Sequence, residues 1–238
     1  MDNAIYATLT RQSGLMREMQ AVANNIANVS TNGFRKEGVI FSEHVVALGG
    51  AEPSLSMADA LGRVVNQAQG PLAQTGGTFD FAIEGEGFFL VDTPQGQHLT
   101  RAGSFTPSPE GELLSLEGHR LLDAGGAPVF VPADARGVTL AQDGTLSAEG
   151  RPLAEIGLFM PTDPNGLVHV GGTRFAAYAG VEPVETAVML QGFLEESNVD
   201  PVSEIARMIT VQRAYEMGQT FLDREDERIR GVISTLSR

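Results

Sequence analysis

The stretch NNIANVSTNGF, residues 24–34, marks the point at which the sequence changes character. It places four asparagines beside three large apolar side chains, at a position where a helix would ordinarily carry charged or aliphatic residues. Its Asn32-Gly33 pair supplies a residue that readily adopts the left-handed backbone conformation, and such a residue ends a helix. We therefore expect a helix from about Asn3 to about Ser30, with Phe34 folding back onto its end.

Upstream of this stretch, apolar residues recur every three or four positions. That spacing describes one face of an amphipathic helix. Glycine, which weakens a helix, is rare in this segment, because Gly14 is the only one before Gly33. The apolar stripe consists of Ile5, Leu9, Leu15, Met16, Met19, Val22, Ala23 and Ile26.

The C-terminal segment repeats this design. It opens with Asp200-Pro201, where the aspartate caps the helix and the proline occupies its first turn. The positions that accompany its heptad stripe hold Gln212, Gln219 and Asp226, which a dry two-stranded seam does not favour, so we expect further chains to meet that face. The heptad stripe is Met208, Tyr215, Leu222, Ile229 and Leu236, widened by Ile205, Ile209, Val232 and Ile233.

Between these segments glycine becomes frequent and the apolar pattern takes a period of two. Short, evenly spaced strands of this kind indicate an antiparallel β domain. Residues 36–74 lack periodicity and indicate an extended connector, with a short helix near Ser56–Val65. The expected domains are residues 1–35 (N-terminal helix and the stretch that ends it), 36–74 (connector), 75–190 (central β domain) and 191–238 (C-terminal helix).

These patterns predict an α+β fold in which long N- and C-terminal helices pair as a coiled-coil-like inner module beside the central antiparallel β domain. A β domain built from one continuous segment covers its own core, but it offers no partner to two helical stripes at the ends of the chain. Such a stripe is only marginally stable by itself in water. The helices are therefore expected to pair with each other and then with other chains, which predicts an assembly subunit.

Composition narrows the class of protein. The net charge is −14, and residues 38–194 account for −12 of it, with six basic and eighteen acidic side chains. Such a surface repels nucleic acid and anionic lipid, so we expect neither as a partner. No apolar run approaches a membrane span, and Asp2, Arg11 and Arg17 break up the N-terminus, which argues against a cleaved signal peptide. The absence of cysteine excludes disulfides and thiolate sites.

The sequence contains no strong catalytic or ligand-binding motif. EGEGFF, residues 84–89, has two of the three glycines of a dinucleotide loop but lies among strands. The four histidines are isolated in sequence, so we expect no metal, cofactor, small-molecule ligand or catalytic residue. One alternative from another class stays open: a carbohydrate-binding or hydrolytic β protein that uses the carboxylates of Asp80, Glu84 or Glu86.

Three blocks of sequence together resemble the bacterial flagellar rod and hook family. They are NNIANVSTNGFRK (residues 24–36), DFAIEGEGFFLVDTPQGQHLTRAGSFTPSPEGELLSLEGHRLL (residues 80–122) and SNVDPVSEIARMITVQRAYEM (residues 197–217), which occur in the family's order. The opening MDNAIYATL and the short length are similar to proximal rod proteins more than to distal ones, and a distal rod subunit is the alternative. The chain departs from the family pattern at Met217-Gly218, where glycine loosens a helix by up to about 1 kcal/mol relative to alanine.

The resemblance implies an axial structural subunit that transmits torque. It also implies export in an unfolded state through the flagellar type III apparatus without signal cleavage, followed by assembly in the periplasm. The implied partners are proximal and distal rod proteins, copies of the chain itself and the export apparatus. The expected assembly contacts are Ile5, Leu9, Met16, Met19, Asn24, Asn25, Ile26, Asn28, Gly33, Phe34, Asn198, Asp200, Met208, Gln212, Arg213, Tyr215, Leu222, Ile229 and Leu236.

The asparagines of the first block have two interpretations. In an assembly, an amide donates to one neighbour and accepts from another without the desolvation cost of an unpaired charge, and a buried amide fixes register. The simpler interpretation is that Asn24, Asn25 and Asn28 cap and solvate the fraying end of a helix.

Overall fold

The computed structural model describes residues 2–46, 55–184 and 186–236, and only the backbone at 2–6, 41–46 and 55–61. These residues form two compact units, between which the chain passes repeatedly. The helical unit comprises Met1–Ala27, Glu37–Val64 and Asp200–Arg238. The β unit comprises Asn28–Lys36 and Val65–Val199.

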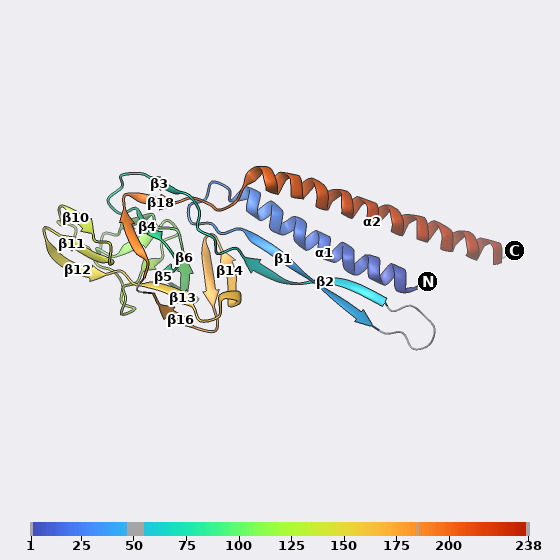
Figure 1. Cartoon of the computed structure of the whole chain (residues 1–238), viewed down its shortest axis with the longest axis horizontal. Helices are drawn as coiled ribbons and strands as arrows, with labels where there is room; N and C mark the ends of the chain where they lie inside the picture. Colours follow the sequence, from blue (N-terminus) through green and yellow to red (C-terminus); the bar gives the residue numbers. More distant parts are fainter. Residues whose placement is uncertain (1, 47–54, 185, 237–238) are drawn as a thin grey trace. The chain divides into compact units, whose positions relative to one another are not determined.

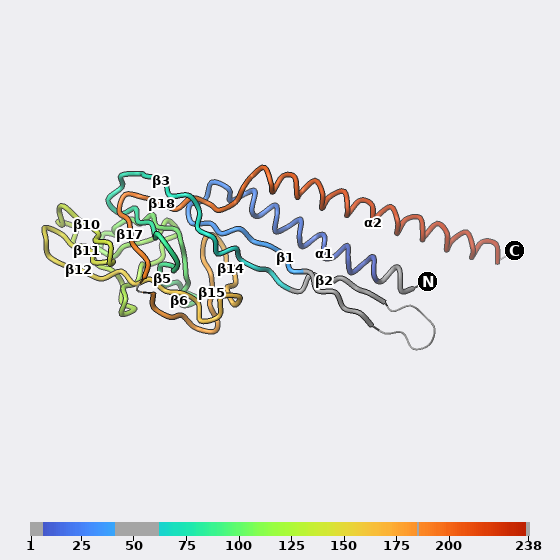
Figure 2. Tube along the Cα trace, viewed as in Figure 1, coloured from blue at the N-terminus to red at the C-terminus, as the bar shows by residue number. Residues whose placement is uncertain are grey.

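Two helices and a two-stranded sheet make up the helical unit. The helices run side by side, and α1 also lies against β1 (Figure 1, Figure 2). Asp200 caps the second helix as expected, because its side chain accepts a hydrogen bond from the Val202 N–H at 3.2 Å. The elements are α1 (Asp2–Ala27), β1 (Glu37–Val46), β2 (Leu55–Val65) and α2 (Pro201–Leu236).

The predicted coiled-coil-like module is wrong. A coiled coil needs apolar side chains at successive levels of its seam. Among the described residues of α2, only Val211 and the carboxylate-bearing Glu204 are buried. The expected companions Gln212 and Gln219 are exposed. Polar groups therefore take up much of the contact between the helices, and the unit also contains a sheet, β1–β2.

The connector also differs from expectation. The short helix predicted near Ser56–Val65 is wrong, because that segment is the strand β2, hydrogen-bonded to β1. A strand of this kind depends on its pairing partner more than on its own sequence, so a local pattern could not reveal it.

The central β domain predicted from the alternating pattern is confirmed. Its largest sheet has nine strands, in the order β14-β15-β6-β5-β9-β8-β7, with β13 added beside β5 and β16 beside β13. Smaller sheets join β10-β11-β12, β17-β4 and β18-β3. The strands are β3 (Leu72–Gln74), β4 (Phe81–Glu84), β5 (Phe88–Thr93), β6 (Gly96–Thr100), β7 (Phe105–Pro107), β8 (Leu113–Ser115), β9 (Arg120–Leu121), β10 (Val138–Leu140), β11 (Thr145–Ala148), β12 (Arg151–Glu155), β13 (Leu158–Pro161), β14 (Leu167–Gly171), β15 (Arg174–Ala177), β16 (Val181–Pro183), β17 (Val188–Gln191) and β18 (Phe193–Glu195), with the 3₁₀ turn η1 (Pro164–Gly166) before β14.

Strand β5 explains the run GFFLV. Phe88 and Leu90 pack into one buried apolar cluster, and Phe89, which points to the opposite face, packs into another. A strand buried on both faces reads as a continuous apolar run instead of an alternation. The strand therefore lies inside the β unit, where it pairs with β6, β9 and β13.

Candidate functional site

Three charged side chains are buried together in the β unit. We call Arg35, Arg101 and Glu195 the junction cluster; each is at most 3 % exposed. Arg35 Nη2 lies 2.9 Å from Glu195 Oε1, and Arg101 Nη1 donates to Glu195 Oε2 at 2.9 Å. Arg35 follows the Asn32-Gly33 turn, Arg101 follows β6, and Glu195 ends β18. The cluster thus joins segments that are far apart in sequence.

Neutral groups also form hydrogen bonds with the junction cluster. The Gly70 N–H donates to Glu195 Oε1 at 2.9 Å, and Arg101 Nη2 donates to the Gly85 carbonyl at 2.7 Å. Arg35 Nη1 donates to the Ala68 carbonyl. The Arg101 guanidinium also lies 5.3 Å from the centre of the Phe88 ring, a distance that suits a cation–π contact.

Two cations share one anion in this cluster. The pKa of Arg35 is lowered to about 10, chiefly because burial disfavours the charged guanidinium; Glu195 opposes that effect and Arg101 adds to it. Burial is also the main reason that the pKa of Arg101 is lowered. The three groups are buried and bound to one another, so the arrangement serves to hold chain segments together and offers no open position to a substrate.

Gly33 brings the first sequence block to the junction cluster. Its φ of +73° is the left-handed conformation that the sequence predicts at this position. The helix α1 already ends at Ala27, however, so Gly33 turns the chain after the helix and does not itself end it. A Cβ at this position would lie 2.2 Å from the Ala102 N, so only glycine fits. The Gly33 N–H donates to the Glu195 carbonyl at 2.7 Å. The next residue, Phe34, is fully buried with its ring against His169.

Asn198 from the third block serves the same junction. Its Oδ1 accepts from the Lys36 N–H at 2.7 Å, and its Nδ2 donates to the carbonyls of Asn66 and Ala68 at 3.0 and 2.7 Å. One amide therefore satisfies backbone groups of two other segments, which a carboxylate or an apolar residue could not do.

Asn25 has a comparable role within the helical unit. It is fully buried, and its Oδ1 accepts from the Glu37 N–H at 2.9 Å. Its Nδ2 donates to the Glu37 carbonyl at 2.8 Å and to Glu204 Oε2 at 2.9 Å. A single amide thereby links the end of α1 to the start of β1 and to the first turn of α2. Neighbouring Asn24 makes a longer contact of 3.4 Å with Glu37 Oε2.

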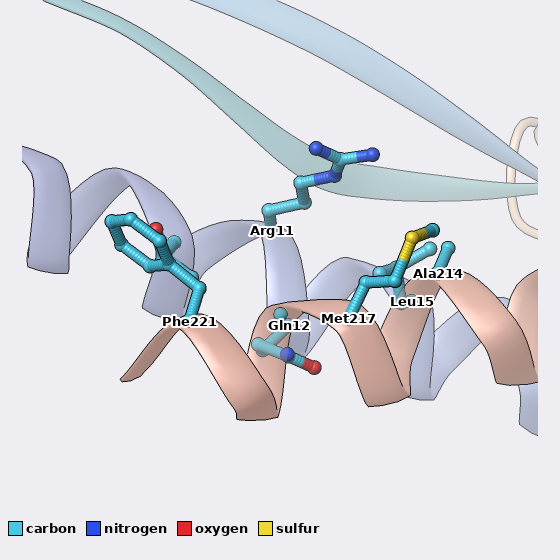
Figure 3. A pocket seen from close by; sticks show the side chains of 8 residues that line it. Arg11, Gln12, Leu15, Ala214, Met217 and Phe221 are labelled. Atoms are coloured by element: carbon cyan, nitrogen blue, oxygen red, sulfur yellow. The ribbon is translucent and has the colours of Figure 1, made fainter. Parts of the chain in front are cut away.

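Polar side chains also set the register of α1 against α2. Arg207 pairs with Glu18 at 2.8 Å, and Gln12 Nε2 donates to the Tyr215 carbonyl at 2.8 Å. Beside Gln12, the two helices enclose a groove of about 340 Å³, seen close up in Figure 3. We call it the helix groove; its lining is Thr8, Arg11, Gln12, Leu15, Ala214, Met217, Gly218 and Phe221.

The Gln12 contact explains why Gly218 departs from the family pattern. A Cβ on residue 218 would lie 2.1 Å from Gln12 Nε2, so Gly218→Ala must displace a buried, hydrogen-bonded amide. We expect this cost to cancel the gain in helix propensity in the parent chain. In a Gln12→Ala background, the same substitution should stabilise the helical unit by about 1 kcal/mol. A double-mutant cycle on urea unfolding, followed by helical circular dichroism, measures the coupling, and additive effects would contradict it.

The predicted assembly residues fall into three groups. Asn25, Gly33 and Phe34 are buried within their own units. The side chain of Ile5 lies outside the described part. Half-buried residues are Met19, Asn24, Ile26, Asn28, Asn198, Met208, Tyr215 and Leu222, whereas Leu9, Met16, Asp200, Gln212, Arg213, Ile229 and Leu236 are exposed.

Sequence reasoning missed several buried polar residues in both units. These are Gln12, Arg35, Glu37, Arg101, Glu195 and Glu204. Three of them had a visible signal, because Arg35, Arg101 and Glu204 lie within the blocks that carry the family resemblance. Glu195 stands just before the third block and looks like an ordinary surface acid.

The open alternative based on carboxylates gains no support from the geometry. Glu84 and Glu86 are exposed, and Asp80 Oδ2 accepts from the Thr75 hydroxyl at 2.6 Å. Within residues 2–46, 55–184 and 186–236, no group of three or more His, Cys, Asp or Glu is placed to hold a metal. None of the described helices combines the length and the apolar character needed to span a bilayer.

Two protein-family models match parts of this chain. Residues 82–148 match the family described as "Flagellar hook protein FlgE/F/G D1 domain", and residues 190–235 match "Flagellar basal body rod FlgEFG protein C-terminal". The two matches contain Arg101 and Glu195 respectively.

Whole-length relatives agree with these matches. The flagellar basal-body rod protein FlgF of Mesorhizobium japonicum is 39 % identical over 91 % of this chain and 90 % of its own. FlgF of Caulobacter vibrioides is 38 % identical over 100 % and 99 %. The flagellar basal-body rod protein FlgG of Bacillus subtilis is 28 % identical over 98 % and 99 %. The resemblance seen in the three blocks is thus confirmed, and the chain belongs to the flagellar basal-body rod protein family, as a structural subunit of the FlgF type.

Proposed function

We propose that this subunit assembles in the periplasm with copies of itself and with other proximal and distal rod proteins, through apolar side chains on α1 and α2. In this proposal the chain is exported by the flagellar type III apparatus, keeps its N-terminal segment and catalyses no reaction. The rod that it helps to build transmits motor torque to the hook and filament.

One observation carries the assembly proposal. The last turns of α2 present four exposed aliphatic side chains, which we call the C-terminal stripe: Ile229, Val232, Ile233 and Leu236, with 38, 51, 60 and 82 % of their surface exposed. Contiguous apolar surface of this kind marks a site of protein–protein contact. Leu9 and Met16 of α1 are exposed as well, at 49 and 41 %.

Retention of the N-terminal segment has separate support. Helix α1 supplies Asn25 to the buried backbone of Glu37 and the buried carboxylate of Glu204. Removing α1 would leave these groups without their partner, at a cost of about 1–3 kcal/mol each. A cleavage that removed α1 would therefore destabilise the helical unit.

The test replaces the four residues of the C-terminal stripe with glutamine, which keeps helix propensity. We expect the variant to be exported at the parental level, to be missing from isolated rods and to restore no motility to a strain that lacks the gene. The control variant, Leu116→Gln with Tyr178→Gln, removes two side chains of the β unit that are each 80 % exposed, and it should behave as the parent does. Normal incorporation of the stripe variant would overturn the proposal.

A further inference from the structure

The junction cluster joins the two ends of the β unit through a single carboxylate. Arg35 lies in the 28–36 segment at one end of the unit, and Glu195 lies in the 193–198 segment at the other. The backbones of the two segments meet at the same place, because the Gly33 N–H donates to the Glu195 carbonyl at 2.7 Å. The first and the last part of the β unit are therefore packed against each other.

The largest sheet of the β unit contains neither of these segments. Its nine strands all lie between Phe88 and Pro183, and several of its pairs, such as β5–β6 and β14–β15, are joined by short turns. The contact between Arg101 and Glu195 closes a much longer loop, because the two residues are 94 positions apart. Closing a long loop costs conformational entropy before its contacts stabilise anything. We therefore expect the sheet to form before the junction cluster.

Charge sets a condition on the later step. Glu195 places one carboxylate oxygen 2.9 Å from each guanidinium group. Without this carboxylate, packing the 28–36 segment onto the β unit would bury Arg35 beside Arg101, which places two like charges in a site with little access to water. A second acid, Glu86, also favours the charged form of Arg101, but it is exposed and so is screened by solvent.

The pKa of Arg35 reflects the same balance. Burial is the main cause of its lowered pKa; Glu195 opposes this effect, and the neighbouring Arg101 adds to it. The carboxylate and the second cation therefore act on Arg35 in opposite directions.

We propose that Glu195 is an interlock between the two ends of the β unit: the 28–36 segment packs onto the unit only once Glu195 lies between Arg35 and Arg101. The sheet and the 193–198 segment come together first, and the 28–36 segment follows. A chain in transit through an export channel has one end still enclosed, so either Arg35 or Glu195 arrives late, whichever end leads. The 28–36 segment then stays undocked until both ends are free. This consequence for export rests on the proposed function, whereas the interlock itself does not.

Native-state hydrogen exchange on the full-length chain tests the interlock. The reporters are the amides of Gly33 and Lys36, because Glu195→Gln keeps both of their acceptors, a backbone carbonyl and the Asn198 side chain. In Glu195→Gln we expect the two reporters to exchange as fast as in an unstructured chain. Strands β5 and β6 should still exchange at least about a hundredfold more slowly than an unstructured chain.

A second substitution in the Glu195→Gln chain separates like-charge repulsion from the loss of hydrogen bonds. Adding Arg101→Met removes the repelling cation and should slow exchange at both reporters by at least about tenfold. Adding Arg120→Met instead is the matched control, because Arg120 is an exposed arginine of the same unit. It should leave exchange at the reporters unchanged.

Three results would overturn the interlock. Reporters that stay protected in Glu195→Gln would show that the 28–36 segment docks without the carboxylate. Fast exchange that Arg101→Met does not slow would show that like charge is not what keeps the segment away. Loss of protection in β5 and β6 would show that the sheet does not form without the junction. All three leave the proposed assembly function standing, because that function is tested by the incorporation of the C-terminal stripe variant into rods.

Discussion

Glu195→Gln is expected to destabilise the β unit by about 3–5 kcal/mol, one of the two largest effects that the structure predicts. The substitution keeps the shape of the side chain but removes the carboxylate that lies 2.9 Å from both guanidinium groups. Arg35 and Arg101 are then left as two buried cations. The amide that replaces the carboxylate also turns a donor toward groups that can only donate.

The measurement is urea unfolding of the purified chain, with hydrogen exchange to locate the change. Faster exchange is expected at residues 28–36, 66–70 and 193–198, the segments that meet at the junction cluster. Glu225→Gln is the matched control, because Glu225 pairs with Arg228 at 2.6 Å on an exposed part of α2. An exposed pair contributes roughly 0–1 kcal/mol, so a similar loss for both variants would contradict the prediction.

A second comparison tests whether the excess positive charge of the junction cluster affects its stability. Arg101→Met leaves Arg35 and Glu195 as a one-to-one pair and removes a cation that lowers the pKa of Arg35. We therefore expect Arg101→Met to cost less than Glu195→Gln, even though it also leaves the Gly85 carbonyl without its donor. The opposite order would show that the hydrogen bonds of Arg101 outweigh the balance of charge.

Part of the fold could be predicted from the sequence, because some structural features depend only on neighbouring residues. The left-handed turn at Gly33, the Asp200 cap and the strands of the central domain each depend on residues close in the chain. The pairing of β2 with β1 and the burial of Glu195 depend on residues far away, so no local pattern reveals them. Glu195 in particular is followed at once by another acid, Glu196, and becomes distinctive only when Arg35 and Arg101 reach it.

The heptad of α2 shows how a correct pattern led to a wrong module. Its residues Met208, Tyr215 and Leu222 are half-buried, whereas Ile229 and Leu236 of the same heptad are exposed. In the structure, the second row of contact positions along α2 consists of Glu204, Val211 and Gly218. Val211 and Gly218 each stand one residue before the predicted companion positions, Gln212 and Gln219. A carboxylate and a glycine at those levels were not recognised as contact residues, because each needs a specific partner on the other helix, Asn25 and Gln12 respectively.

Asn25→Ala is expected to destabilise the helical unit by about 4 kcal/mol, on a scale comparable with the loss at Glu195. The substitution removes three hydrogen bonds and leaves the Glu37 N–H, the Glu37 carbonyl and the Glu204 carboxylate buried without this partner. Each unsatisfied group costs about 1–3 kcal/mol, and more when it is charged. Urea unfolding followed by helical circular dichroism measures the loss.

Asn24→Ala is the natural control, because Asn24 is half-buried and its contact with Glu37 Oε2 is 3.4 Å long. We expect it to cost less than about 1 kcal/mol. Equal costs at both positions would mean that the asparagines only solvate the end of a helix, as the simpler interpretation holds. A large loss confined to Asn25, with faster hydrogen exchange at Glu37 and in the first turn of α2, would show that one buried amide fixes where α1, β1 and α2 meet. The asparagine would then be required because no other side chain of its size donates twice and accepts once at that point.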